Sequence, residues 1–195
     1  MIRIGIVGDI GSGKSFIAKK FGYPVFNADE EVGKLYKKNK KIFIKLKKIL
    51  PKYIHTFPIS KNEITNAILS NKINLQKIIK IVHMEIRKKM YLFIQKNKNK
   101  KIIILDIPLL MENKINKKND ILIFINAKKN IIQKKLKKRK NFNQKLINKF
   151  KKVQLPLVYK KKKSHFIINN NFTKMSVKND INIILNQILK WRKLF

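Results

Sequence analysis

The most constraining part of the sequence is the stretch 8–15, GDIGSGKS, which directly follows the apolar run 2–7. Its residues fit the spacing G-x-x-x-x-G-K-[ST], which joins a buried strand to a helix. Glycines let the backbone curl so that successive N–H groups face a polyphosphate, and the following helix start adds its partial positive charge. We therefore expect a phosphate-binding loop, with Lys14 on the β- and γ-phosphates and the Ser15 hydroxyl on Mg²⁺. A plain glycine turn is the alternative.

Length and composition favour one folded domain. The chain has 195 residues, of which 44% are hydrophobic, and this suffices for one compact core but not for two large ones. The absence of cysteine excludes disulfides and thiolate metal sites, and His55, His83 and His165 show no metal-ligand spacing. Because the first expected strand begins at residue 2 and no apolar run is long enough for a membrane span, we expect a cytoplasmic protein without a signal peptide.

Basic residues greatly outnumber acidic residues. Forty-eight Lys and Arg residues against ten Asp and Glu residues give a formal net charge of +38. Taken alone, this charge favours a nucleic acid or an anionic membrane as partner. However, lysines occur throughout the chain together with abundant Ile and Asn, and no nucleic-acid recognition motif accompanies them. We therefore interpret the charge as compositional drift, which would also favour polyanionic small substrates, and keep a nucleic-acid-binding protein as the rival hypothesis.

Apolar runs alternate with helical periodicity along the chain. The expected strands are 2–7, 24–28, 101–106, 121–125 and 165–168. The expected helices are 14–21, 29–36, 41–50, 60–95, 127–139, 143–153 and 176–194. Strands that alternate with helices predict an α/β fold with a five-stranded parallel sheet and helices on both faces. Ligands of such sheets bind beyond the carboxyl ends of the strands.

Several local signals refine this prediction. Gly22 follows the first helix at a position that favours a left-handed cap, and Asp29 is expected to cap the second. Ser60 and Glu63 have the spacing of a capping box. The basic run 160–163 is expected to be a solvated or mobile loop.

Acidic residues are scarce, so their positions are informative. Asp29 ends the second expected strand and should face the phosphate loop across the carboxyl edge of the sheet. A carboxylate there can accept a proton from an attacking hydroxyl or hold a water on Mg²⁺, and its alternative role is the helix cap alone. Asp106 ends the third expected strand, where an acid can lie near the metal. The alternative is an aspartate that orders the loop before Pro108.

Two basic positions also suggest anion binding. His83 and Arg87 are four residues apart on the long helix, so one face presents both. The alternative for His83 is a buried imidazole. Arg139 is one of only four arginines and lies in a lysine-rich segment. Its planar guanidinium suits phosphate oxygens better than an ammonium does, and its alternative is an ordinary exposed cation.

Together these residues resemble the dephospho-coenzyme A kinase family, which comprises P-loop kinases of the nucleoside monophosphate kinase type. The start IGIVGDIGSGKS is similar to that family's first strand and loop, and FNADEEVGKLY to its D-A-D segment. HMEIR resembles its H-P-x-[VI]-R, and ILDIPLLMEN its D-x-P-L-L-[FY]-E. KKLKKR, VQLPLVYK and FIINNN resemble its basic lid helix, its Q-x-P-x-x-x-K stretch and its closing strand. DIPLLMEN and the spaced HxxxR discriminate best, because the loop alone fits many kinases.

The resemblance implies a single P-loop kinase domain over 1–195, with a helical acceptor-binding insertion and a lid. The implied core is 1–55, 100–127 and 165–195, the acceptor-binding region 56–99 and the lid 128–164. The implied reaction is the ATP-dependent phosphorylation of the ribose 3'-hydroxyl of dephospho-coenzyme A, the last step of coenzyme A synthesis, with Mg²⁺. Another nucleotide or small-molecule kinase is the alternative within the same class. The resemblance implies a monomer or weak oligomer with no specific nucleic acid and no membrane partner.

The resemblance also implies roles for individual residues, which are assigned from their positions in the matching motifs. The implied catalytic residues are Asp29 as base, Lys14 and Arg139, and Lys135 joins Arg139 in the lid over the transferred phosphoryl group. The implied ATP site consists of Gly11, Ser12, Gly13, Lys14, Ser15, Phe16 and, beside the adenine, Asn170. The implied acceptor site consists of His83, Arg87, Asp106 and Pro108. Ser15 would hold Mg²⁺, with Asp29 or Asp106 directly or through water.

The chain departs from the family pattern at five positions. Asn27 replaces the first Asp of D-A-D, so Asp29 is the only acid there. Asp9 replaces a loop glycine, and we expect its charge to point outward. Met84 replaces the Pro of the histidine motif, and His165 an Asp before the last strand. Lys135 replaces a lid Arg, and a lysine lacks the planar pair of donors with which a guanidinium binds two phosphate oxygens.

Overall fold

The computed structural model describes residues 1–139 and 142–191, without the side chains of 174–176. The chain forms two compact units, each of which is described by itself. The sheet unit consists of Met1–Phe26, Asn99–Phe142 and Gln154–Phe195, and the helical unit of Asn27–Lys98 and Asn143–Val153. The predicted division into core, acceptor-binding region and lid stays a prediction.

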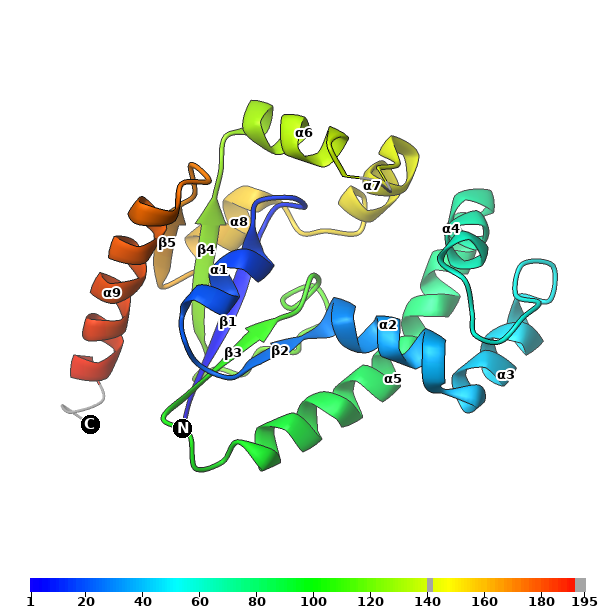
Figure 1. Ribbon diagram of the computed structural model, residues 1–195, viewed down its shortest axis with the longest axis horizontal. Helices are drawn as coiled ribbons and strands as arrows, with labels where there is room; N and C mark the ends of the chain where they lie inside the picture. The colour runs from blue at the N-terminus through cyan, green and yellow to red at the C-terminus, as the bar shows by residue number, and fades with distance from the viewer. Residues whose placement is uncertain (140–141, 192–195) are drawn as a thin grey trace. The chain divides into compact units, whose positions relative to one another are not determined.

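The strands form one five-stranded sheet in the order β2-β3-β1-β4-β5 (Figure 1). They are β1 (Ile2–Gly8), β2 (Val25–Asn27), β3 (Ile102–Asp106), β4 (Ile121–Asn126) and β5 (Phe166–Asn169). β1 pairs in parallel with β3 on one side and with β4 on the other, and β4 pairs in parallel with β5. The predicted parallel sheet is therefore confirmed.

The helices follow the predicted α/β alternation. They are α1 (Lys14–Lys20), α2 (Ala28–Lys38), α3 (Lys40–Ile49), α4 (Lys61–Ser70), α5 (Lys72–Lys96), α6 (Lys129–Lys137), α7 (Gln144–Lys151), α8 (Leu157–Lys162) and α9 (Lys174–Trp191). Gly22 follows α1 with φ +74°, so the predicted left-handed cap is confirmed. No helix in the described part of the chain is long and apolar enough to cross a membrane.

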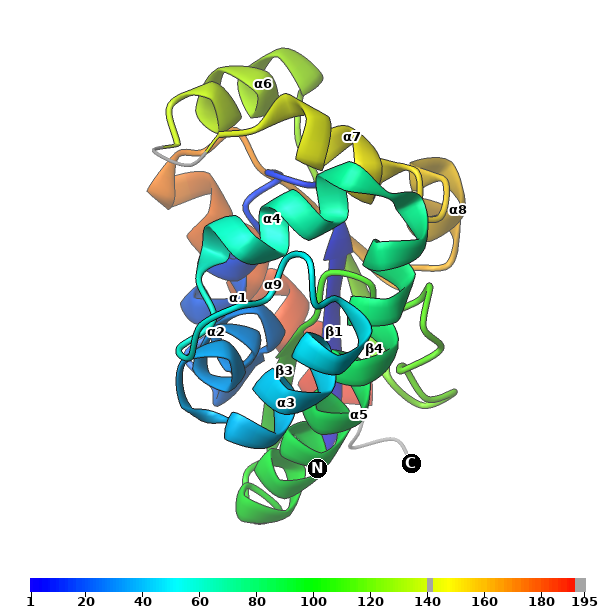
Figure 2. The same cartoon turned by 90° about the vertical axis from the view of Figure 1, so that its right-hand side faces the viewer.

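The core of the sheet unit lies on both faces of the sheet. Ile4 and Ile6 point to one face, where they pack with residues of α1 and α9 in a cluster of buried apolar side chains. The intervening Gly5 faces the other way, where a Cβ would lie 2.9 Å from a methyl carbon of Leu122. α8 packs against β1, and Figure 2 shows α8 across the sheet from α1 and α9. Each fully buried isoleucine contributes about 1.5–3 kcal/mol, so both faces stabilise the sheet.

His165 starts the pairing of β5 with β4. Its backbone N–H donates to Leu122 O at 2.8 Å, and its Nδ1 accepts from Leu122 N at 3.0 Å. The imidazole thus supplies a side-chain acceptor at the position where the family pattern has an aspartate.

In the helical unit, α2, α3 and α4 pack against the long helix α5, and α7 packs against α4. Lys149 of α7 donates from Nζ to Ile68 O at 2.6 Å and to Leu69 O at 2.8 Å. These carbonyls belong to the last turn of α4, where a cation also interacts favourably with the helix dipole. Lys149 therefore ties α7 to α4.

Two details of the predicted helices are wrong. The long helix 60–95 is divided at Asn71, whose side chain accepts from Ile73 N at 2.9 Å and so caps α5 as a new helix. The capping box of Ser60 and Glu63 at the start of α4 is confirmed. The basic run 160–163 is not a loop, because 160–162 lie in α8, and Lys160 is only 2% exposed although 161–163 are exposed as expected.

The cap of α2 also differs from the prediction. Asn27 rather than Asp29 is the N-cap, and its Oδ1 accepts from Glu30 N at 2.8 Å. The reason is that β2 ends at Asn27 in an extended conformation, so the helix begins at Ala28, one residue before the predicted start. Asp29 is left in the first turn as an exposed side chain.

Candidate phosphate-binding site

The loop between β1 and α1 has the backbone of a phosphate cradle. Gly8, Gly11 and Gly13 have φ values of +148°, +84° and +93°, which side-chain-bearing residues rarely adopt. Gly13 is the N-cap of α1, and no side chain caps that helix start. The helix start therefore has no side-chain cap that would compete with a phosphate for its first N–H groups.

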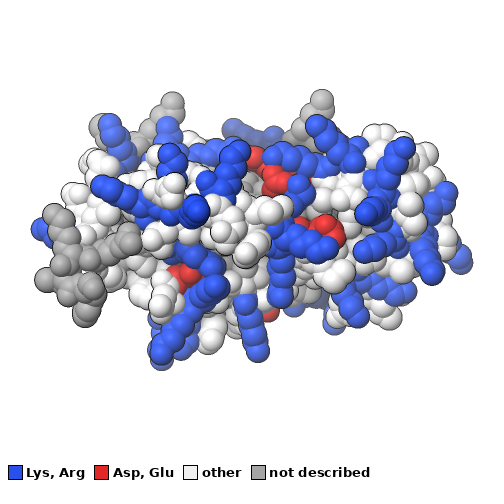
Figure 3. Space-filling view, turned by 90° about the horizontal axis from the view of Figure 1, so that it is seen from below, with Lys and Arg blue, Asp and Glu red and all other residues white. Residues whose placement is uncertain are grey.

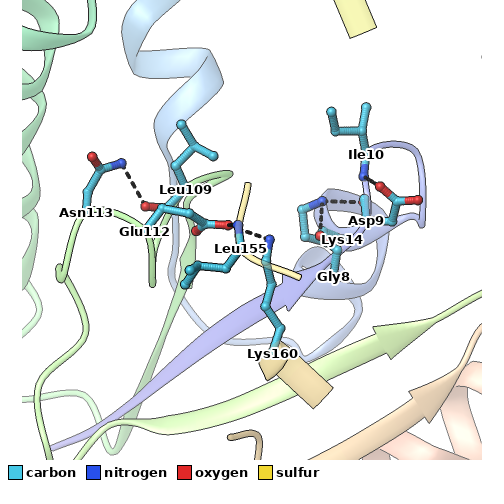
Figure 4. Close-up of polar contacts among 9 residues, drawn as sticks. All are labelled: Gly8, Asp9, Ile10, Lys14, Leu109, Glu112, Asn113, Leu155 and Lys160. Atoms are coloured by element: carbon cyan, nitrogen blue, oxygen red, sulfur yellow. Dashed lines mark hydrogen bonds and ion pairs between the residues drawn. The ribbon is translucent and has the colours of Figure 1, made fainter. Parts of the chain in front are cut away.

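Lys14 folds back over this loop. Its Nζ donates to Asp9 O at 2.7 Å and to Gly8 O at 3.3 Å (Figure 4). These carbonyls hold the ammonium at the loop that the sequence predicts to bind phosphate, and phosphate oxygens can replace them. Ser15 and Phe16, the next two residues of α1, are exposed.

Asp9 is oriented differently from the prediction. Its side chain is only 9% exposed, and its Oδ1 accepts from Ile10 N at 2.7 Å. The expectation that Asp9 points outward is wrong, because its carboxylate finds a backbone donor within the loop itself. The carboxylate adds one negative charge to a loop predicted to bind an anion.

Asn170 connects the loop to the end of β5. Its Nδ2 donates to Ser12 O at 2.8 Å, and its Oδ1 accepts from Phe172 N at 2.8 Å. A Cβ on Gly13 would collide with the Asn170 amide. Glycine at position 13 is thus required both by its left-handed backbone and by the close approach of Asn170. Ser12 Oγ is buried and has no partner among the described residues.

The first half of the predicted lid packs beside the loop. A Cβ on Gly11 would lie 2.9 Å from Leu136 Cδ2 and 3.1 Å from Ile132 Cγ2, both on α6. Lys135 Nζ lies 4.7 Å from the centre of the Phe172 ring, a cation–π contact. Arg139 follows α6 as an exposed side chain. The predicted action of Lys135 and Arg139 on a phosphoryl group stays a prediction.

Asp106 and Pro108 lie at the carboxyl end of β3. Asp106 is 3% exposed, and Pro108 follows it in the loop as a half-buried residue. β3 pairs directly with β1, with Gly5 opposite Leu105. The phosphate loop and Asp106 therefore leave neighbouring strands at the same edge of the sheet, where ligands of such folds bind.

The other predicted residues belong to the helical unit. Asp29 is in the first turn of α2, and His83 and Arg87 are one turn apart on α5. α2 packs against α5, and the ion pair of Glu31 with Lys89, at 3.0 Å, joins these two helices. The structure thus brings the helices of Asp29, His83 and Arg87 together within this unit.

His83 and Arg87 interact electrostatically. Burial lowers the pKa of His83 below its ordinary value of 6.5, and the charge of Arg87 lowers it further. His83 is therefore neutral at pH 7 and can donate or accept a hydrogen bond, while Arg87, one turn later, is exposed.

Phe172 is a site residue that the sequence analysis missed. It has φ +65°, donates its N–H to Asn170 and presents its ring to Lys135. The signal available in the sequence was an aromatic residue two positions after an asparagine that can form a side-chain turn. Ile132 and Leu136, which contact Gly11, were recognised only as helical residues.

Fold and loop together define a class, that of P-loop phosphotransferases. A sequence model of the dephospho-CoA kinase family matches residues 2–175. The chain belongs to this family.

Individual relatives agree with this assignment. The dephospho-CoA kinase of Wolbachia sp. subsp. Brugia malayi is 37% identical over 129 residues, which are 64% of this chain and 66% of that protein. The alignment thus spans just under two thirds of that relative's length. The structure of TT1252 from Thermus thermophilus matches 97% of this chain and 96% of its own, with a TM-score of 0.74 and 23% identity. A dephospho-CoA kinase from Campylobacter jejuni matches 95% of this chain and 96% of its own, with a TM-score of 0.62 and 20% identity. These two structures support the fold alone.

Proposed function

We propose that this chain transfers the γ-phosphoryl group of ATP to the ribose 3'-hydroxyl of dephospho-coenzyme A, which yields coenzyme A and ADP. The proposal rests on membership of the dephospho-CoA kinase family and on the geometry of the phosphate loop. It places the enzyme in the cytoplasm as a monomer or weak oligomer.

The observation that carries the proposal is the position of Lys14. Its ammonium is held 2.7 Å from Asp9 O, over a loop with three left-handed glycines and a helix start without a side-chain cap. When ATP binds, Lys14 exchanges these carbonyls for oxygens of the β- and γ-phosphates, and the N–H groups of Gly13 and its neighbours donate to the same phosphates. The charge that develops in the transition state is thereby stabilised by groups already in place.

Asp29 is the proposed general base. Its exposed carboxylate accepts the proton of the 3'-hydroxyl while the hydroxyl oxygen forms a bond to the γ-phosphorus. The bond from that phosphorus to the bridging oxygen breaks, and the electron pair leaves on ADP. Because Asn27 is uncharged, no neighbouring carboxylate of the D-A-D type can replace Asp29.

His83 and Arg87 are proposed to hold the anionic acceptor. The guanidinium of Arg87 offers a planar pair of donors for phosphate oxygens, and the neutral imidazole of His83 adds a hydrogen bond. Arg139 and Lys135 are proposed to stabilise the transferred phosphoryl group. Closure around the substrates would exclude water, which otherwise competes as acceptor.

Hard oxygen donors at the loop fit Mg²⁺. The Ser15 hydroxyl is exposed, and Asp106 offers a carboxylate at the adjacent strand end, directly or through water. The described residues contain no group of three or more His, Cys, Asp or Glu that could hold a metal ion. This suits Mg²⁺, which is usually bound by one or two protein groups together with phosphates and waters. Bound there, or with Asp29 in place of Asp106, the ion would neutralise charge on the β- and γ-phosphates.

A panel of acceptors with Mg-ATP tests the proposal. We expect phosphorylation of dephospho-coenzyme A, with the new phosphate at the 3'-position by phosphorus NMR, and no comparable turnover of nucleoside monophosphates. Lys14→Met should lower kcat at least about 100-fold. Lys19→Met, which removes an exposed lysine from the same helix, is the matched control and should retain full activity. Turnover of a nucleoside monophosphate without turnover of dephospho-coenzyme A would assign the chain to another kinase class.

The positive charge supports a rival proposal, binding of nucleic acid. Figure 3 shows Lys and Arg side chains spread over the visible face rather than gathered in one patch. Such a distribution favours weak binding without sequence preference. Nanomolar affinity for an oligonucleotide at 150 mM salt would favour the rival, whereas binding only at low salt would leave the kinase proposal in place.

A further inference from the structure

A buried ion pair outside the phosphate loop joins two segments of the sheet unit. Lys160 Nζ of α8 lies 2.6 Å from Glu112 Oε1, and the two side chains are 2% and 8% exposed. The same carboxylate oxygen accepts a 3.0 Å hydrogen bond from Leu155 N (Figure 4). One carboxylate oxygen thus serves both an ammonium and a backbone N–H group away from water.

Stability alone does not explain this pair. Burial removes both charges from water, and a well-packed apolar pair of similar volume often stabilises a fold as well or better. Among the residues with a described exposure, Lys160 is the one basic residue that is buried, in a chain with 48 Lys and Arg residues. We therefore look for the role of this ion pair in the two chain segments that it connects.

The first segment is the loop after β3. Glu112 follows Asp106 by six residues, and Pro108 lies between them. The loop is compact, because Asn113 donates to Leu109 O from both its backbone N and its Nδ2. A fixed position of Glu112 therefore also restricts Pro108 and the strand end that carries Asp106, next to the phosphate loop.

The second segment is the connection that follows α7. The chain leaves the helical unit at Val153 and re-enters the sheet unit at Gln154. Leu155 is the next residue, and its N–H donates to Glu112. Pro156, the N-cap of α8, has no N–H and no side-chain cap. Glu112 therefore holds the backbone of this connection at the point of re-entry.

We propose that Glu112 and Lys160 are positioning residues for the acceptor side of phosphoryl transfer, an inference that rests on the proposed function. Glu112 fixes the loop of Asp106 and Pro108 against the connection after α7, and Lys160 holds the carboxylate in place through the 2.6 Å ion pair. The pair acts through these segments and not on the reacting atoms.

Three variants test the proposal: Glu112→Gln, Lys160→Met and the double variant. Each single variant leaves a buried charge without its counter-ion and should lower Tm by about 5 °C or more. The double variant keeps an amide oxygen for Leu155 N and removes both charges, so its Tm should return to within about 3 °C of wild type. Its kcat/KM for dephospho-coenzyme A should nevertheless remain at least about 10-fold lower, with the KM for ATP within about 2-fold of wild type.

Asp120→Asn is the matched control. It breaks a different ion pair of the sheet unit, in which Arg3 Nη2 lies 2.9 Å from Asp120 Oδ2, whose side chain is 3% exposed, at the amino ends of β1 and β4. This variant should lower Tm and leave the kinetics with dephospho-coenzyme A unchanged. If the double variant has wild-type acceptor kinetics, the pair is only structural and the proposal is overturned.

A second measurement separates this proposal from the proposed function. Amide hydrogen exchange at Leu155 should be at least about 10-fold faster in Glu112→Ala than in Asp120→Asn, whichever acceptor the enzyme uses. Equal exchange in both variants would contradict the role of Glu112. An absence of turnover of dephospho-coenzyme A by the wild-type protein would instead contradict the proposed function.

Discussion

Asn170 Nδ2 donates a 2.8 Å hydrogen bond to Ser12 O, which links the end of β5 to the phosphate loop across 158 residues of sequence. Asn170 is 3% exposed, and its Oδ1 accepts from Phe172 N on the other side. Both ends of the amide are therefore used, and the loop is held by a residue that the family resemblance places beside the adenine. A nucleotide bound there would meet a loop that is already ordered.

Asn170→Ala should loosen this loop. The substitution leaves Ser12 O and Phe172 N without these partners, at a cost of about 2–3 kcal/mol in the free energy of unfolding. We also expect the KM for ATP to rise, because the loop must then be ordered by the nucleotide. Asn169→Ala is the matched control, since the side chain of the exposed Asn169 accepts a hydrogen bond from the side chain of the exposed Asn126 and none is described between it and the phosphate loop. Equal KM values for ATP in both variants would contradict a role of Asn170 in the loop.

Ser12→Ala should not destabilise the protein, in contrast to Asn170→Ala. The Ser12 hydroxyl is buried and has no hydrogen-bond partner among the described residues. The free-energy cost of removing the hydroxyl from water is therefore not offset by a hydrogen bond. Ser12→Ala should leave Tm unchanged or raise it, corresponding to about 0–1 kcal/mol. The KM for ATP should stay the same, because the proposed phosphate contacts of the loop come from backbone N–H groups and the Lys14 ammonium and not from the Ser12 hydroxyl. Ser15→Ala is the contrasting variant and should lower activity at limiting Mg²⁺. A large loss of ATP affinity in Ser12→Ala would show that the hydroxyl contacts the nucleotide.

Asp9 places a negative charge in the phosphate loop. Asp9→Asn keeps an oxygen acceptor for Ile10 N and removes the charge, so ATP should bind more tightly, by about 1 kcal/mol or five-fold in Kd. The gain should shrink as salt is added, because salt screens the charge. Isothermal titration with Mg-ATP at two salt concentrations measures both effects. Weaker binding in Asp9→Asn would mean that the ionised carboxylate organises the loop.

The sheet and the loop could be predicted because local rules determine them. Apolar runs bounded by helical periodicity gave the five strands within one or two residues, and the G-x-x-x-x-G-K-[ST] spacing identified the cradle with Lys14. By contrast, the burial of Lys160 depends on Glu112, 48 residues earlier in the chain. A basic run is normally solvated, and only tertiary packing overrides that expectation.

The missed details share this physical origin. The side chain of Asp9 turned inward because a backbone N–H was available one residue away, and Phe172 joined the site through contacts with Asn170 and Lys135. The division of the long helix at Asn71 depended on a side-chain cap that competes with helix continuation. Hydrophobic periodicity alone does not show whether a helix continues through such a residue or ends there at a cap.

The carboxylate of Glu63 organises the turn before α4. Its Oε1 accepts from His55 N at 2.7 Å and from Thr56 N at 3.2 Å, and its Oε2 accepts from Ser60 N at 2.7 Å. Burial alone would raise the pKa of Glu63, but these hydrogen bonds outweigh it and hold the pKa below the ordinary value of 4.5. The ionised form is thus the one that the folded helical unit favours.

Glu63→Gln should therefore destabilise the protein in a pH-dependent way. A group whose pKa is lower in the folded state adds stability above its unfolded-state pKa, and this stability is lost as the pH falls through the folded-state value. At pH 7 the loss should be about 1 kcal/mol, since one amide oxygen cannot accept from all three N–H groups. Urea unfolding at several pH values measures the difference between variant and wild type, which should be largest near neutral pH and shrink below about pH 4.5. A difference that stays constant down to pH 3 would mean that the charge of Glu63 contributes nothing and that only its shape matters.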